Sequence, residues 1–178
     1  SYLGDAHENL LAVKLDGPTK EDYVWGFRVG FMTYGVKGGN PALYAALENK
    51  TGGAIRGNIS NASNLAQILL LQEYKAAHYE EQKIEKYQTL KNRYLKVKDI
   101  FSKHPEYASC FEALPFNSGY FMCVEIKKQD AEKIRQVLLQ KYSIGLIAFN
   151  KLLRVAFSSV PLNDLEALFD GLYKACQE

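Results

Sequence analysis

The pattern of apolar and polar residues begins with two short apolar runs, at residues 10–15 and 27–34. Both runs are rich in branched or aromatic side chains, and their length is typical of buried strands. Glycines among residues 35–39 predict a turn after the second run. The first part of the chain is therefore expected to contain two strands joined by the segment between them.

A helix is predicted to follow the turn. Asn40 is suited to the cap position and Pro41 to the first helical position, and the helical pattern continues to about residue 50. The adjacent glycines at 52–53 predict the end of this helix. The polar residues 54–63 then predict an irregular segment.

The longest helical signal runs from residue 73 to about residue 103, after a short apolar stretch at 64–71 that predicts a buried helix of its own. The apolar positions of the long signal recur every three or four residues: Ile84, Tyr87, Leu90, Tyr94, Val97 and Phe101. This spacing is typical of a helix that packs one face, and its lysines alternate with acidic residues as on a solvated face. His104 and Pro105 predict its end.

The last third of the chain alternates short extended runs with helical ones. Extended runs are predicted at 110–113, 119–126, 144–149 and 152–157, the last two joined by a turn at Asn150-Lys151. Asp130 predicts the cap of a helix at 131–142, and Asn163-x-x-Glu166 predicts a capping box for a helix at 164–176. This order predicts a small α/β sandwich with helices packed on one face of a sheet.

Composition and charge narrow the class of protein. The formal net charge is +2, which gives no reason to expect nucleic acid or an acidic membrane as a partner. No run approaches about 18 consecutive apolar residues, so no membrane span is predicted. The three cysteines and three histidines show no metal-ligand spacing, so we expect no metal site and free thiols in a reducing cytoplasm.

The segment between the first two strands carries the candidate chemistry. Lys20 follows the first strand, where sheet enzymes place reactive groups, and Arg28 returns toward the same end between Gly26 and Gly30. A guanidinium offers forked donors that suit a phosphate. A lysine beside another cation has a lowered pKa, which makes its amine available for a Schiff base.

This segment resembles the cofactor-lysine motif of the class I/II aminotransferases, pyridoxal-phosphate enzymes with the aspartate aminotransferase fold. The positions that match the motif are Gly17, Thr19, Lys20, Gly26, Arg28 and Gly30. The chain departs from the family at Gly17, where a serine is frequent, and at Tyr23, where the family usually has a small residue. The resemblance implies that Lys20 forms the Schiff base and that Thr19 and Arg28 bind the phosphate of pyridoxal 5'-phosphate.

The resemblance covers the whole chain and implies the C-terminal part of this α/β fold. It implies that residues 1–75 end the large cofactor-binding domain, 76–104 form a long connecting helix and 105–178 form the small domain. The ring-stacking aromatic and the aspartate that pairs with the ring nitrogen would lie upstream. We therefore expect a C-terminal part of a longer enzyme, inactive alone.

Two further arginines are candidates for substrate binding. Arg154 is the single charge in an apolar strand, and it needs an anionic partner from elsewhere in the fold or from a ligand. By resemblance, Arg154 binds the substrate α-carboxylate. The run from Arg56 to Ser60 and Asn61 resembles the family's Arg-x-x-x-Ser-Asn, whose arginine reaches across a homodimer to a second carboxylate.

These residues imply an aminotransferase that moves an amino group from an amino acid, such as aspartate, to a 2-oxo acid. In that scheme Lys20 also moves the proton at the substrate α-carbon. Two alternatives stay open. One is a lyase or decarboxylase of the same fold, and the other is the aminotransferase-like sensor domain of a transcriptional regulator.

Overall fold

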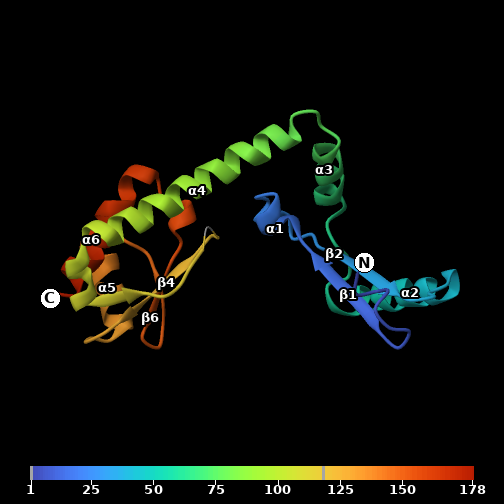
Figure 1. The fold of residues 1–178 in the computed structure, drawn as a ribbon, viewed down its shortest axis with the longest axis horizontal. Coiled ribbons are helices and arrows are strands. Elements are labelled where there is room, and N and C mark those ends of the chain that lie inside the picture. The colour runs from blue at the N-terminus through green and yellow to red at the C-terminus, as the bar shows by residue number, and fades with distance from the viewer. Residues whose placement is uncertain (1, 118) are drawn as a thin grey trace. The chain divides into compact units, whose positions relative to one another are not determined.

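The computed structural model describes residues 2–117 and 119–178. The chain divides into two compact units, Ser1–Glu80 (unit 1) and Glu81–Glu178 (unit 2). Both mix helices with antiparallel sheet, as the α/β prediction required. Figure 1 shows unit 1 in blue to green and unit 2 from green through yellow to red.

Unit 1 is built on a two-stranded antiparallel ladder. Its strands pair without a break from Leu11↔Val36 to Asp16↔Phe31. The elements of unit 1 are β1 (Leu11–Asp16), α1 (Pro18–Glu21), a 3-10 turn (Trp25–Phe27), β2 (Phe31–Val36), α2 (Pro41–Asn58) and α3 (Asn64–Tyr74).

The second strand begins later than the apolar run at 27–34 predicts. Phe27 closes the 3-10 turn and Arg28 has a left-handed backbone, with φ of +53°. A left-handed residue cannot continue a strand, so regular pairing starts only at Phe31. Arg28 is therefore a loop residue that precedes β2.

Helix α2 extends well beyond its predicted end. Asn40 caps it as predicted, its side chain accepting from the Leu43 amide at 3.0 Å. The helix then continues through both glycines at 52–53 to Asn58, so the predicted break and the irregular segment that was to begin at residue 54 are wrong. A glycine costs a helix only about 1 kcal/mol, which an 18-residue helix can absorb. Ser60, with φ of +70°, lies just past its end.

The two helices predicted at 64–71 and 73–103 are both present, and their bounds differ from the prediction. Helix α3 ends at Tyr74 and α4 spans Tyr79–Lys103, with a turn between them in which the Tyr79 amide donates to the Ala76 carbonyl. The end of α4 agrees with the His104-Pro105 signal, and a 3-10 turn (Pro105–Ser109) follows. The periodic apolar positions from Ile84 to Phe101 all lie in α4.

Unit 2 contains a four-stranded antiparallel sheet with the strand order β3-β4-β6-β5. Side chains alternate along its central strands, so that Met122, Val124 and Ile126 of one and Leu153 and Val155 of the other are buried. The elements are α4 from Glu81 onward, β3 (Phe111–Ala113), β4 (Met122–Ile126), α5 (Ala131–Tyr142), β5 (Ile147–Phe149), β6 (Leu152–Val155) and α6 (Leu165–Ala175).

The end of α4 together with α5 and α6 supplies the rest of the unit 2 core. Val97, Ile100, Ile134, Leu138 and Phe169 from these helices belong to the same buried cluster as the inward strand residues. Figure 1 shows these helices gathered around β4 and β6. The predicted small α/β sandwich is confirmed, with its strands shorter than the extended runs predict.

The two predicted caps in unit 2 differ in outcome. The Asp130 carboxylate accepts from the Lys133 amide at 3.0 Å, so this cap is confirmed. The prediction of a capping box at Asn163 is wrong. Residues Leu162–Asp164 form a 3-10 turn, and no side chain caps α6. Glu166 instead accepts from Lys96 of α4 at 2.7 Å, a partner 70 residues away.

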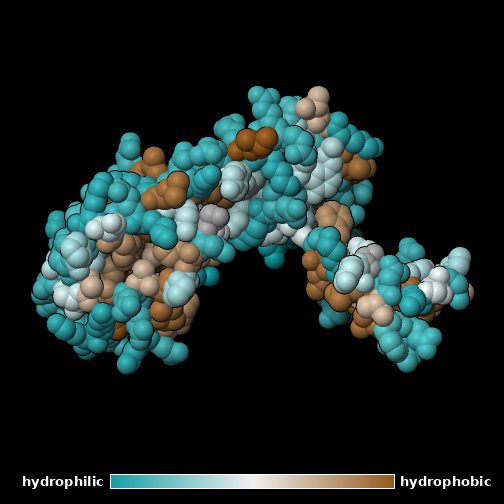
Figure 2. Space-filling model, in the orientation of Figure 1, coloured by the Kyte–Doolittle hydropathy of each residue, from teal (hydrophilic) through white to brown (hydrophobic). Residues whose placement is uncertain are grey.

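The core of unit 1 is much smaller. Its buried apolar residues are Val29, Ala66 and Leu70. Leu11, Val13 and Leu15 of β1 share one face and are exposed, Leu15 by 71%. Figure 2 shows hydrophobic side chains on the surface of this unit. Among the helices of the described residues, none is both long enough and apolar enough to cross a membrane.

Candidate cofactor and substrate site

The candidate site is centred on the connection between β1 and β2, residues 17–30, which we call the lysine loop. Its two ends meet because Asp16 pairs with Phe31 at the end of the ladder. A β-carbon on Gly30 would lie 3.4 Å from the Asp16 carbonyl oxygen, and one on Gly17 would lie 3.9 Å from the Val29 carbonyl oxygen. The loop is therefore closed at its base by backbone in close contact.

Lys20 lies on the short helix α1, directly after β1. Pro18 occupies the start of this helix, where its fixed φ is favourable, and its carbonyl accepts from the Asp22 amide at 3.0 Å and the Val24 amide at 3.4 Å. Thr19 is half-buried and Lys20 is exposed. The helix thus presents the Lys20 side chain at the surface of unit 1.

Arg28 lies on the return limb of the same loop. Its guanidinium is exposed, and its Nη1 donates to the Trp25 carbonyl at 3.3 Å. The left-handed backbone at Arg28 turns the chain toward Gly30 and β2. The structure therefore places Thr19, Lys20 and Arg28 on one closed loop between two paired strands.

Side chains from outside the loop hold Asp22, two residues after Lys20. Tyr74 donates to its Oδ2 at 2.7 Å and Tyr79 donates to its Oδ1 at 2.5 Å. The sequence patterns did not identify these three residues. The two tyrosines are 52 and 57 residues away from Asp22, so no local signal in the sequence links them to it.

Arg154 lies on β6, a central strand of the unit 2 sheet, and pairs with Cys123 and Ile147. It alternates with the buried Leu153 and Val155, so its half-buried side chain is on the face opposite the core. The guanidinium carbon lies 4.4 Å from the centre of the Phe121 ring, a cation–π contact that the sequence patterns missed. Among the described residues of unit 2, no carboxylate forms an ion pair with Arg154.

Arg56 lies on the last turns of α2 and is exposed. Its Nη1 donates to the Ser60 Oγ at 2.5 Å. The residue is thus part of a helix, whereas the sequence predicted an irregular segment there. Arg56 belongs to unit 1 with the lysine loop, and Arg154 belongs to unit 2.

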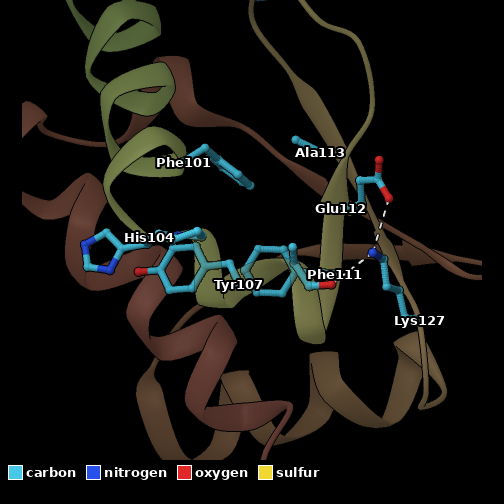
Figure 3. Close-up of a pocket in the computed structure, with 9 residues that line it drawn as sticks. Phe101, His104, Tyr107, Phe111, Glu112, Ala113 and Lys127 are labelled. Carbon is cyan, nitrogen blue, oxygen red and sulfur yellow. Dashed lines mark hydrogen bonds and ion pairs between the residues drawn. The ribbon is translucent and has the colours of Figure 1, made fainter.

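A shallow pocket of about 300 Å³ lies in unit 2, at the end of α4 (Figure 3). Phe101, Tyr107 and Phe111 form part of its wall, and the His104 ring stacks on Tyr107 with 4.8 Å between ring centres. Lys127 already pairs with Glu112 at 3.3 Å and donates to the Ala108 carbonyl at 2.9 Å. None of the predicted site residues lines this pocket.

The donors of the lysine loop fit pyridoxal phosphate. An aldehyde requires a primary amine, which Lys20 provides at the surface of the unit. A phosphate requires cationic and hydroxyl donors, which Arg28 and Thr19 provide from the two limbs of the same loop. Among the described residues, no cluster of three side chains could hold a metal ion.

Comparison with known proteins gives structural neighbours only. No protein-family model matches the chain, and no curated protein does. An aminotransferase from Anaerococcus prevotii has a similar fold, with a TM-score of 0.74 and 23% identity over 97% of this chain and 40% of that one. An aspartate transaminase from Corynebacterium glutamicum has a TM-score of 0.54 and 19% identity over 83% of this chain and 36% of that one.

These likenesses establish the fold. The chain spans about two fifths of the length of the two aminotransferase structures, at 40% and 36%. Its order of strands, long helix and small α/β sandwich agrees with the C-terminal portion of their fold. The chain therefore has the α/β fold of part of an aminotransferase.

Proposed function

We propose that the chain is part of a pyridoxal-phosphate-dependent aminotransferase of class I/II. The observation that carries this proposal is the closed lysine loop, which presents an amine, a hydroxyl and a guanidinium between two paired strands. The likeness of the fold to aminotransferases supports it. Because the chain spans two fifths of those structures, the activity belongs to the whole enzyme.

Each residue of the loop has one role in this proposal. Lys20 binds the cofactor aldehyde through its Nζ, while Arg28 and Thr19 hold the phosphate by charge-assisted hydrogen bonds. When bound, the cofactor supplies the electron sink that makes the substrate α-carbon acidic. Once the amino group of the substrate had displaced Lys20 from the cofactor aldehyde, the freed Nζ would act as the base that moves the proton between the substrate α-carbon and the cofactor.

Arg154 orients the amino acid in this scheme. Its guanidinium is half-buried on the outer face of a central strand and has an aromatic ring as neighbour. A carboxylate can accept two parallel hydrogen bonds from such a group, which fixes the substrate in one orientation. We propose the α-carboxylate of the amino acid, and of the 2-oxo acid that accepts the amino group, as that ligand.

The proposal extends to a homodimer that prefers a dicarboxylic substrate such as aspartate. In it, Arg56 of the partner subunit would bind the second carboxylate, and its exposure at the end of α2 leaves it accessible for such a contact. Arg56→Ala should lower activity on aspartate by about two orders of magnitude and spare alanine, because only aspartate loses a charged partner. Equal activity of wild type and variant on aspartate would remove the dimer contact from the proposal.

The proposal also places the enzyme in the cytoplasm. All three cysteines are free thiols, and Cys110 is buried. Unpaired cysteines are typical of a reducing compartment.

Borohydride reduction of the full-length protein tests the proposed function. Reduction in the presence of pyridoxal phosphate should fix the cofactor to Lys20, and peptide mass spectrometry should find the added mass in the peptide that contains it. Lys14→Arg is the matched control, since Lys14 lies on β1 and pairs with Asp16 at 2.9 Å. The control should label normally and Lys20→Arg should not; a label on Lys14, or on no lysine, would refute the assignment.

A further inference from the structure

Two tyrosines at the α3–α4 junction hold the carboxylate that follows the cofactor lysine. Tyr74 ends α3 and Tyr79 begins α4, and their rings meet edge to face with 5.4 Å between centres. Their hydroxyls donate to the two oxygens of Asp22, at 2.7 and 2.5 Å. We call these three residues the tyrosine clamp. The tyrosine clamp lies within unit 1.

The hydrogen bonds of the tyrosine clamp join neutral hydroxyl donors to a charged acceptor. A hydroxyl that donates to an ionised carboxylate forms a shorter and stronger hydrogen bond than a neutral pair does. Both Asp22 oxygens are engaged, so the side chain is held at two points. Burial and the Asp22 carboxylate together hold the pKa of Tyr74 well above its usual range, so Tyr74 keeps its donor proton at neutral pH.

Asp22 connects the turn of α1 to the left-handed part of the lysine loop. It is the C-terminal cap of α1, and its own amide donates to the Pro18 carbonyl across the turn that contains Lys20. The next residue, Tyr23, has a φ of +62°, and Arg28 has a φ of +53°. A non-glycine residue in this left-handed region is strained, and it persists only where its surroundings hold it.

Helix α3 contacts both limbs of the lysine loop. The backbone hydrogen bonds on the first limb include those from the Asp22 and Val24 amides to the Pro18 carbonyl and from the Phe27 amide to the Val24 carbonyl. Val29 is the one buried residue of the loop's return limb, with Ala66 and Leu70 of α3 as its core partners. Helix α3 therefore supports the loop at both limbs, at Val29 through its apolar face and at Asp22 through Tyr74.

We propose that Tyr74 and Tyr79 are positioning residues for the cofactor lysine. By binding Asp22, the two tyrosines hold the turn of α1 before it and the left-handed backbone of Tyr23 after it. They thereby set the position of Lys20 relative to Arg28. The inference rests on the proposed function for its catalytic meaning. The structural part, that the clamp orders residues 17–30, does not depend on that function.

Amide hydrogen exchange of the full-length, cofactor-free protein tests the structural part. In the Tyr74→Phe/Tyr79→Phe variant, peptides from residues 17–30 should exchange about tenfold faster than in the wild type, because Asp22 loses both charged hydrogen bonds. Peptides from α5 should be unchanged. Tyr87→Phe is the matched control, since Tyr87 is an exposed tyrosine on α4, the helix that Tyr79 begins.

Cofactor affinity, measured on the same variants, tests the positioning part. The double variant should bind pyridoxal phosphate about tenfold more weakly than the Tyr87→Phe variant does. Without cofactor, the two variants should have the same midpoint of unfolding. Asp22→Asn should have an intermediate effect, because the amide keeps one acceptor oxygen for the tyrosines. Should the double variant not fold, the two single variants replace it in both measurements, each with a smaller effect in the same direction.

The outcomes separate the inference from the proposed function. Suppose that Lys20 is labelled by borohydride, and that the double variant shows wild-type exchange rates and wild-type cofactor affinity. This result would overturn the positioning role and leave the proposed function standing. Faster exchange in residues 17–30 without labelling of any lysine would support the clamp and refute the function. Weaker binding that accompanies an equal loss of stability in the cofactor-free protein would also overturn the positioning role.

Discussion

At the scale of single residues, the guanidinium of Arg154 forms no ion pair with a carboxylate in the described part of unit 2. It stands on the outer face of β6 with the Phe121 ring 4.4 Å away. Arg154→Ala should therefore cost about 2–5 kcal/mol of substrate binding for every amino acid, because all share the α-carboxylate. Cofactor binding should survive, since Arg154 does not hold the cofactor in the proposed scheme.

Steady-state kinetics and cofactor absorbance of the full-length enzyme check this expectation together. Lys151→Ala, an exposed change in the adjacent turn, is the control and should alter neither. A loss of cofactor absorbance in Arg154→Ala equal to the loss of activity would make Arg154 a structural residue.

A second residue, His104, gives unit 2 a pH dependence. Hydrogen bonding to Glu106 at 2.8 Å raises the pKa of His104 above its usual value of 6.5, helped by Glu166 at 3.5 Å and by the charge of Asp170, while burial opposes the shift. A raised pKa in the fold means that protonation stabilises the folded state. This contribution should be complete below about pH 6.5 and should disappear as pH rises through the folded pKa.

Urea unfolding over a range of pH measures this effect. The free energy of unfolding should fall with rising pH more steeply in the wild type than in His104→Gln, whose side chain does not titrate. Parallel curves for the wild type and His104→Gln would contradict the assignment.

At the scale of elements, helix α2 tolerates the glycines that were expected to end it. A β-carbon added at Gly52 or Gly53 would meet no atom within 4 Å. Alanine at either position should therefore stabilise the protein by about 0.5–1 kcal/mol, since it restricts the unfolded chain and favours the helix. Gly38 is the opposite case: its φ is +70°, so alanine there should destabilise by about 1 kcal/mol.

Urea unfolding of the full-length protein, followed by far-ultraviolet circular dichroism, compares the three variants. Opposite signs for Gly52→Ala and Gly38→Ala are the expected result. Destabilisation by all three substitutions would show that α2 is not a continuous helix through residues 52–53.

At the scale of the whole molecule, the two units differ in how much core they contain. Unit 2 buries apolar side chains from α4, α5, α6 and its sheet in one cluster. The buried cluster of unit 1 is Val29, Ala66 and Leu70, and a two-stranded ladder is only marginally stable by itself. Residues 81–178 expressed alone should therefore unfold in one cooperative transition, whereas residues 1–80 alone should not.

Thermal denaturation and amide proton dispersion of the two pieces check this difference. Cooperative melting of residues 1–80 would contradict it.

Much of the fold could be predicted from the sequence because its signals are local. The Asn40 and Asp130 caps depend on a hydrogen bond to an amide three residues on, and the end of α4 depends on His104-Pro105. Alternation of apolar residues likewise determined which side chains of β4 and β6 face the core. Lys20 likewise follows the first strand as predicted, whereas Arg28, predicted within the second strand, lies on the loop before β2.

The remaining features were decided by contacts between residues far apart in the chain. Glu166 pairs with Lys96 of α4 instead of forming a capping box, and β6 lies between β4 and β5. The left-handed step at Arg28 fits a loop whose ends the β1–β2 ladder brings together, and Asp22 is held by tyrosines more than fifty residues away. A local pattern carries no information on such partners, because only the packed tertiary structure brings them within hydrogen-bonding distance.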